Sequence, residues 1–282
     1  IAPFDVRQGN FVGAGVNAVT KSGTNRYTAS TYYQWRNEGM VGTKAGENTY
    51  NPGTFSFHNF GILGGGPVVK DKLFFFFSFE DESNTYPGTT FTANPGGATV
   101  GGNMTRVLAS DLNSLSAFLK DKFNYDTGPY EGYEFATPAR RYLAKVDYNL
   151  NQRNKLSFRY NHLDSSTDVL LSNSSSLGFG SRRSSTTGLN FANSNYSILE
   201  NIRSFIGEWN STFGANKANT LIAGYTYQDE SRGYKGEMFP MVDILEGGSV
   251  YTTFGFEPFT PNNELRYKTF QVQDNFMMYL PK

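Results

Sequence analysis

Alternation of apolar and polar residues is the main pattern along this chain. From Lys155 to Asn161, for example, Leu156, Phe158 and Tyr160 alternate with charged or polar residues. Successive side chains of a β-strand point to opposite faces, so this period of two predicts strands with one apolar and one polar face. Most segments are near the ~9–11 residues that a tilted strand needs to cross a bilayer. The eight predicted strands span residues 27–36, 54–66, 73–82, 139–149, 155–162, 204–213, 220–228 and 270–280.

The connections between these strands alternate in length. Three of them are short, at residues 67–72, 150–154 and 214–218, and four are long. The long connections span residues 37–53, 83–138, 164–196 and 230–265. Outer-membrane barrels have short periplasmic turns and long extracellular loops, whereas a soluble β-sandwich has no reason to keep every second loop short. The pattern therefore predicts a membrane barrel whose four long connections are extracellular.

One long connection has a helical pattern. Between residues 110 and 123, Leu112, Leu115 and Leu119 recur at helical spacing, and Ser110 or Asp111 is the expected N-cap. We expect a short helix in an external loop, the alternative being a helix packed in a soluble core. The other long connections are rich in Gly, Ser, Thr and Asn, and no regular structure is predicted in them.

The apolar faces indicate contact with lipid. In lipid every backbone polar group must pair within the protein, so the sheet must close. The predicted fold is all-β: a transmembrane antiparallel β-barrel of which this chain supplies about eight strands. A lipid-facing Arg or Lys costs about 2–4 kcal/mol at the bilayer midplane, so the charged face is assigned to the lumen. The candidate lumen-facing residues are Arg141, Lys145, Asp147, Arg159, Glu208, Gln271 and Gln273.

Aromatic residues tend to lie at the predicted strand ends. Such residues form girdles at the two membrane interfaces, although tyrosine is also simply a good strand former. The candidate girdle residues are Tyr27, Trp35, Tyr148, Tyr160, Tyr227 and Tyr279. Phe74 and Phe76 alternate with the lipid-facing rings and would point inward. We expect a plug that packs against the barrel wall to cover them.

Composition narrows the class of protein. Aromatic residues make up 16% of the chain, yet they lie among polar residues, as expected for two-faced strands. The 25 basic and 25 acidic residues balance, which gives no indication of nucleic-acid binding. The absence of cysteine excludes disulfides and thiol catalysis. No run of 18 or more apolar residues predicts a transmembrane helix, and the first residues do not resemble a signal peptide.

Motifs in the first 82 residues resemble those of TonB-dependent outer-membrane receptors, especially the Oar-like group and more distantly SusC-like proteins. The motifs occur in order: GAGVNAVTKSGTN at 13–25, WRN at 35–37, NFG at 59–61 with GGGP at 64–67, and KDKLFFFF at 70–77. The resemblance implies that residues 1–25 end a plug domain and that residues 26–282 begin a 22-stranded barrel. It also implies an upstream carboxypeptidase-like domain, and a TonB box and most of the plug before Ile1.

Motifs for other chemistry are weak. Residues 13–18 fit a GxGxxA dinucleotide fingerprint, but a strand and turn follow where a helix is needed. His58 and His162 lie on separate strands without metal-binding or catalytic spacing. Asp121, Asp126, Glu131 and Glu134 could bind calcium, although a solvated loop is favoured because the EF-hand spacing is absent. We therefore expect no enzyme activity and no cofactor.

The function predicted from the family resemblance is TonB-dependent uptake of a nutrient across the bacterial outer membrane. Its expected partners are outer-membrane lipid, TonB through the upstream region, and a surface lipoprotein or other subunits of an outer-membrane complex. One alternative is a structural or secretion-associated barrel subunit. A second is a stand-alone eight-stranded barrel, since eight strands can close around a packed interior.

Overall fold

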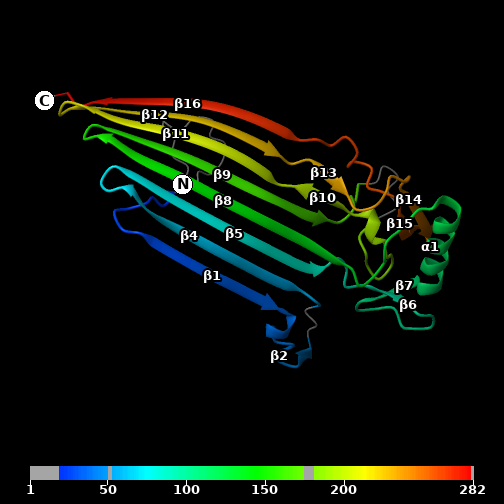
Figure 1. Cartoon of the computed structure of the whole chain (residues 1–282). Helices are drawn as coiled ribbons and strands as arrows, with labels where there is room; N and C mark the ends of the chain where they lie inside the picture. Colours follow the sequence, from blue (N-terminus) through cyan, green and yellow to red (C-terminus); the bar gives the residue numbers. More distant parts are fainter. Residues whose placement is uncertain (1–18, 50–52, 175–180, 281–282) are drawn as a thin grey trace.

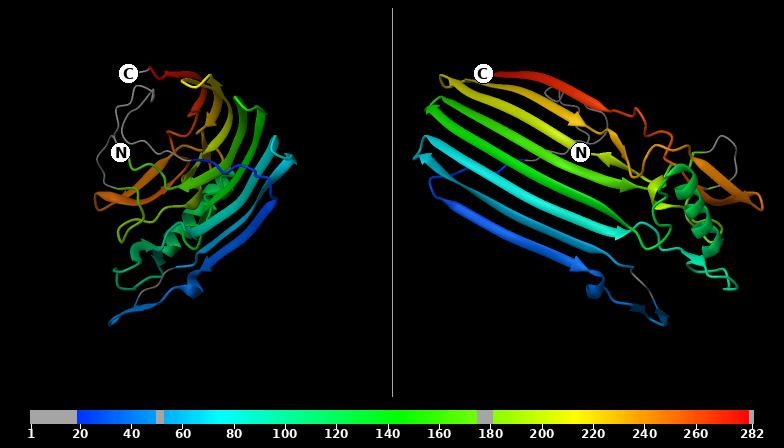
Figure 2. Two further views of the ribbon diagram at one scale, coloured as in Figure 1. Left: turned by 90° about the vertical axis from the view of Figure 1, so that its left-hand side faces the viewer. Right: turned by 45° about the vertical axis from the view of Figure 1, so that its right-hand side comes forward.

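Eight long strands form one antiparallel sheet in the computed structural model, which describes residues 19–49, 53–174 and 181–280. Each strand pairs with its predecessor and successor in the order β1-β4-β5-β8-β9-β11-β12-β16 (Figure 1). The strands are β1 (Thr28–Asn37), β4 (Ser56–Val69), β5 (Leu73–Pro87), β8 (Glu134–Asn151), β9 (Asn154–Val169), β11 (Asn201–Phe213), β12 (Lys217–Asp229) and β16 (Arg266–Met278). The predicted all-β antiparallel fold is confirmed. The sheet is curved, and β1 and β16 form its two edges without pairing to each other (Figure 2).

Tight turns join the strands at one end of the sheet. They occupy residues 70–72, 152–153 and 214–216, and Asp71 and Gly214 adopt positive φ angles there, 62° and 65°. We call this end the turn end. The strands are longer than predicted at the opposite end, where β5 reaches Pro87 and β8 already begins at Glu134. The sequence prediction left these distal residues out because they do not alternate: those of β5 are mostly polar, and those of β8 include Phe135, Ala136 and Pro138.

The sheet register separates two faces. Phe158, Gly207, Ala223 and Val272 form one row across neighbouring strands, and Arg159 and Glu208 point to the other side. Adjacent rows on the first face hold further rings, and Phe158, Phe205 and Phe270 are exposed. We call this side the aromatic face and the opposite side the polar face. None of the helices among the described residues is long and apolar enough to cross a membrane.

Replacing Phe158 by arginine is expected to cost about 2–4 kcal/mol of folding free energy in a bilayer. The Phe158 ring is 56% exposed and lies near the middle of the aromatic face, where it would contact lipid. Asn161→Arg is the matched control, since Asn161 lies on the polar face of the same strand. Urea titration of the folded, fast-migrating band in phospholipid vesicles measures both changes. Equal loss of stability in the two variants would contradict the assignment of the faces.

Three long connections pack together beyond the opposite end of the sheet. They contain β6 (Thr92–Asn94), β7 (Met104–Leu108), α1 (Ala109–Phe123), η2 (Ala192–Ser194), β10 (Tyr196–Leu199), β13 (Arg232–Tyr234), β14 (Val242–Glu246) and β15 (Ser249–Phe254). Their buried core consists of Ala93, Val107, Leu112, Leu119, Tyr125, Leu189, Phe191, Tyr251 and Phe254. We call this unit the cap; Figure 1 shows α1, β14 and β15 side by side. The prediction that only residues 110–123 would be structured was therefore wrong.

The described residues of the connection between β1 and β4 form short elements. These are η1 (Glu38–Met40), β2 (Lys44–Ala45) and β3 (Asn48–Thr49). The predicted helix is confirmed as α1, but its N-cap is Leu108, which has no side-chain capping bond, so the expected Ser110 or Asp111 cap was wrong. Asp111 instead lies in the first turn and accepts a hydrogen bond from the Tyr251 hydroxyl at 2.8 Å. That bond joins the helix to β15.

Arg106 links all three connections of the cap. Its Nε donates to the Thr187 carbonyl at 2.8 Å, and its terminal nitrogens reach Glu246 and the Ser249 hydroxyl. The guanidinium also lies 5.6 Å from the centroid of the Tyr251 ring. A planar group with five donors can hold several partners in one geometry, which suits a position where separate chain segments meet.

Candidate functional site

The polar face of the sheet brings together all seven residues that the sequence predicted for the lumen. Lys145 on β8 lies directly opposite Arg159 on β9, and Arg159 lies opposite Ile206 on β11. Following the same register to β16 places all seven side chains on this face. Arg141 is paired with Glu82 at 3.0 Å, and Lys145 with Asp147 at 3.5 Å. The face therefore carries mixed charge held in ion pairs.

The segment before β1 crosses this polar face. Figure 2 shows the chain leaving β1 on the concave side of the sheet. The Ser22 hydroxyl accepts a hydrogen bond from Lys145 Nζ at 2.8 Å, and Thr20 Oγ1 accepts one from Arg159 at 3.4 Å. Asn25 binds Asp71 in the β4–β5 turn, accepting from its backbone N–H at 2.8 Å and donating to its carboxylate. Polar contacts thus attach residues 19–25 to the wall at three places.

Glycine at position 23 allows the closest approach. A Cβ atom placed on Gly23 would lie 2.3 Å from the Phe75 carbonyl oxygen and 2.8 Å from the Gly66 oxygen. Only a residue without a side chain fits there. Phe76, beside this contact on the polar face, is 7% exposed. The segment supplies part of the cover that the sequence analysis expected for Phe74 and Phe76.

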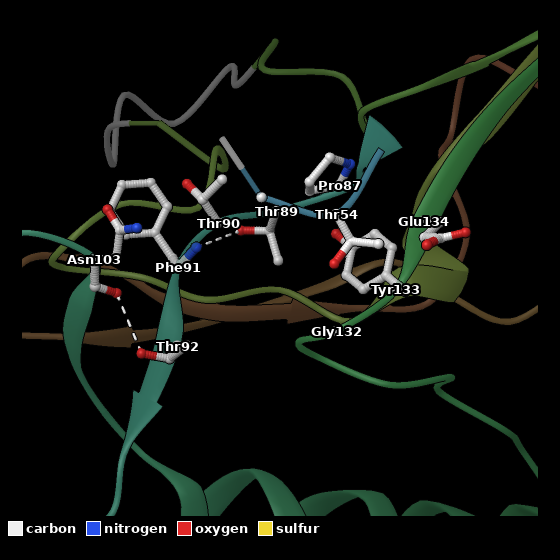
Figure 3. Close-up of a pocket in the computed structure, with 11 residues that line it drawn as sticks. Thr54, Pro87, Thr89, Thr90, Phe91, Thr92, Asn103, Gly132, Tyr133 and Glu134 are labelled. Carbon is white, nitrogen blue, oxygen red and sulfur yellow. Dashed lines mark hydrogen bonds between the residues drawn. The ribbon is translucent and has the colours of Figure 1, made fainter. Parts of the chain in front are cut away.

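A cavity of about 380 Å³ lies where the β1–β4 and β5–β8 connections meet the strand ends (Figure 3). Thr54 comes from the β1–β4 connection, Thr89 to Thr92 follow β5, and Tyr133 and Glu134 lead into β8. Burial raises the pKa of the Tyr133 hydroxyl, while its hydrogen bond from Asn195 opposes that rise. The sequence does not predict this cavity because two separate connections contribute its lining.

Beside the segment lies a second cavity of about 320 Å³, lined by Val19, Thr20, Lys145, Ser157, Arg159, Ile206 and Glu208. Lys145 is only 14% exposed. Arg159 Nε and the Asp147 Oδ2 atom are buried without a partner among the described residues. Buried polar atoms of this kind are met by water or by a bound group. The interface between the segment and the wall is therefore suited to hydration.

The predicted girdle residues occupy different levels. Tyr27, Tyr148 and Tyr279 lie at the turn end, and Trp35 and Tyr227 lie toward the long connections. Tyr160 lies near the middle of β9, in one row with Phe205 and Ala144. A girdle composed of these six residues remains a prediction.

Ion pairs on the aromatic face were not predicted. Asp81 pairs with Arg140 at 2.9 Å, and Asp229 pairs with Arg266 at 3.2 Å, and both pairs lie in one register row. Next to them Asp164 binds Arg203 and His162. Because arginine is costly in lipid, this row marks where the apolar belt ends on the side of the long connections.

Three of the four acidic residues considered for calcium have separate contacts. Asp121 pairs with Lys122 at 2.9 Å, the Asp126 carboxylate accepts the Gly128 N–H, and Glu131 accepts the Ala93 N–H. No group of three or more metal-ligating side chains occurs in the described ranges. The GxGxxA motif at 13–18 lies outside the described residues.

The chain is similar in part to known proteins. Residues 19–133 match the family model described as an outer membrane beta barrel domain. The TonB-dependent transporter Oar of Myxococcus xanthus is 29% identical over 173 residues, which cover 57% of this chain. The chain spans 15% of that relative's length. The outer membrane transporter YddB of Escherichia coli gives a TM-score of 0.48 at 9% identity, covering 90% of this chain and 27% of that one.

Proposed function

We propose that this multi-pass segment of an outer-membrane β-barrel belongs to a TonB-dependent transporter that takes up a nutrient. The observation that carries the proposal is the attachment of residues 19–25 to the polar face by Lys145, Arg159 and Asp71. These contacts are polar, and they lie beside a cavity suited to water. The segment can therefore be released without unfolding an apolar core. The similarity to Oar supports the same function.

In this proposal the polar face lines the lumen and residues 19–25 are the last part of a plug. The long connections and the cap lie outside the cell, and the tight turns lie in the periplasm. TonB would bind upstream of residue 19 and pull on the plug, and the nutrient would pass the loosened segment. No covalent step is needed.

The first alternative, a structural or secretion-associated subunit, uses the same barrel with a different partner. The second alternative requires a closed eight-stranded barrel. The described sheet has β1 and β16 at separate edges, so it does not have the pairing that this alternative needs.

Energy-dependent release of the segment is the expected result in cells. With the full-length protein carrying Ser22→Cys, maleimide labelling should rise when TonB is present and the inner membrane is energised. A protonophore or deletion of TonB should return labelling to the basal level. Ala215→Cys in the exposed β11–β12 turn is the control and should label equally in every condition. Labelling of Ser22→Cys that is indifferent to TonB would contradict the proposal and favour a structural role.

A further inference from the structure

We propose that the cavity between the β1–β4 and β5–β8 connections binds a neutral carbohydrate. This inference rests on the proposed transport function only for its biological use, since binding itself can be measured without transport. The volume of about 380 Å³ falls within the range of small-molecule sites, ~300–1,000 Å³. Figure 3 shows the residues that line it.

Hydroxyl groups dominate the polar part of the lining. Thr54 and Thr90 are exposed, and their side chains have no hydrogen-bond partner in the described part of the chain. The Thr89 hydroxyl accepts the Phe91 N–H at 3.1 Å, which leaves its own proton to donate. The backbone carbonyl of Asn103 accepts a hydrogen bond from the Thr92 N–H at 2.9 Å, while the Asn103 side-chain amide stays available. Such groups both donate and accept, as the hydroxyls of a sugar require.

Ring and pyrrolidine surfaces supply the apolar part. Phe91 and Tyr133 are half-buried and line the cavity together with Pro87. Tyr133 is held in place because its ring lies against Gly88, where a Cβ would be 2.1 Å from the ring. A pyranose has an apolar C–H face as well as a rim of hydroxyls. A rigid aromatic wall beside free hydroxyls fits both parts of such a ligand.

The charge of the lining argues against anionic ligands. Among the described residues that line the cavity, Glu134 is the one carboxylate, and none is a lysine or arginine. Recognition of phosphate or carboxylate groups ordinarily uses arginine or lysine. A cationic ligand is the competing possibility, since it could pair with Glu134 and lie over the rings. The four threonines and the asparagine favour the uncharged sugar.

The test is binding to the purified full-length protein in detergent. The protein is first applied to an array of neutral and acidic glycans, and the strongest neutral binder is then titrated by calorimetry. Saturable binding to a neutral glycan is expected. Thr90→Trp should fill the cavity and weaken that binding at least about tenfold. Thr99→Trp, in the same connection but outside the lining, should leave the affinity unchanged.

Two further measurements separate loss of binding from misfolding, and a neutral ligand from a cationic one. If Thr90→Trp alters the heat-modifiable migration of the folded protein, the Thr90→Ala and Asn103→Ala double variant replaces it, and the same weakening is expected. Trilysine should not bind the unsubstituted protein, and Glu134→Gln should leave binding of the neutral glycan unchanged. The proposal is overturned if no neutral glycan binds, if binding survives Thr90→Trp in the folded protein, or if trilysine binds in a Glu134-dependent manner instead. Glycan binding without TonB-dependent release of the segment would overturn the proposed transport function alone.

Discussion

Replacing Gly23 by alanine is expected to detach residues 19–25 from the sheet. The new methyl group would lie 2.3 Å from the Phe75 carbonyl oxygen, and that oxygen belongs to the backbone of a paired strand and cannot move aside. The segment must therefore move instead, and it would lose the contacts of Ser22 and Thr20 with the wall. Limited proteolysis by trypsin at Lys21 measures the change, with cleavage expected to accelerate at least about tenfold.

Gly42→Ala is the matched control, because a Cβ at Gly42 meets no atom within 4 Å. Its cleavage at Lys21 should equal that of the unsubstituted protein. If Gly23→Ala is cleaved no faster than Gly42→Ala, the close approach of the segment to β4 and β5 does not exist in solution.

The second large effect is expected at Phe191, whose ring is 0% exposed in the core of the cap. Phe191→Ala removes a whole buried ring, a change that typically costs about 3–5 kcal/mol. The cap should open while the membrane-embedded sheet stays folded, because the core of the cap is separate from the strand pairs. Hydrogen exchange should then accelerate in α1 and β15 but remain slow in β8 and β9.

Phe118→Ala provides the comparison within the cap. Phe118 is 52% exposed on α1, so its loss should change exchange in the cap very little. Equal effects of the two substitutions would show that the buried core does not hold the cap together. Uniform acceleration across the sheet would show that the cap and the barrel wall unfold as one unit.

The sheet could be predicted because lipid on one side and water on the other impose a period of two. Leu156, Phe158 and Tyr160 follow that rule, and the register confirms their shared face. Beyond the lipid-facing part of the sheet, the alternation of apolar and polar residues stops. The distal part of β5 is mostly polar on both faces, and Glu134 to Pro138 of β8 do not alternate and end in a proline, so the prediction stopped short at Glu82 and at Ala139.

The cap could not be predicted for a different reason. Its core joins Val107, Phe191 and Tyr251, which come from three connections and have no common period. Only α1 has a local signal, because a helix repeats its apolar residues within a few positions. Arg106 likewise looks like an ordinary loop residue until its partners at Thr187 and Glu246 are brought together by the fold. The lining of the carbohydrate cavity is scattered in the same way.

The cap also has a consequence for biogenesis, because its core can form only after its three connections have come together. Leu112 shares one core with Leu189 and Tyr251, which belong to connections further along the chain. Until these connections meet, α1 is a short amphipathic helix without its apolar partners, and helices of this length are marginal in water. We expect a periplasmic chaperone that shields exposed Phe and Leu to bind the β5–β8 connection, and a stalled folding intermediate to be cleaved there.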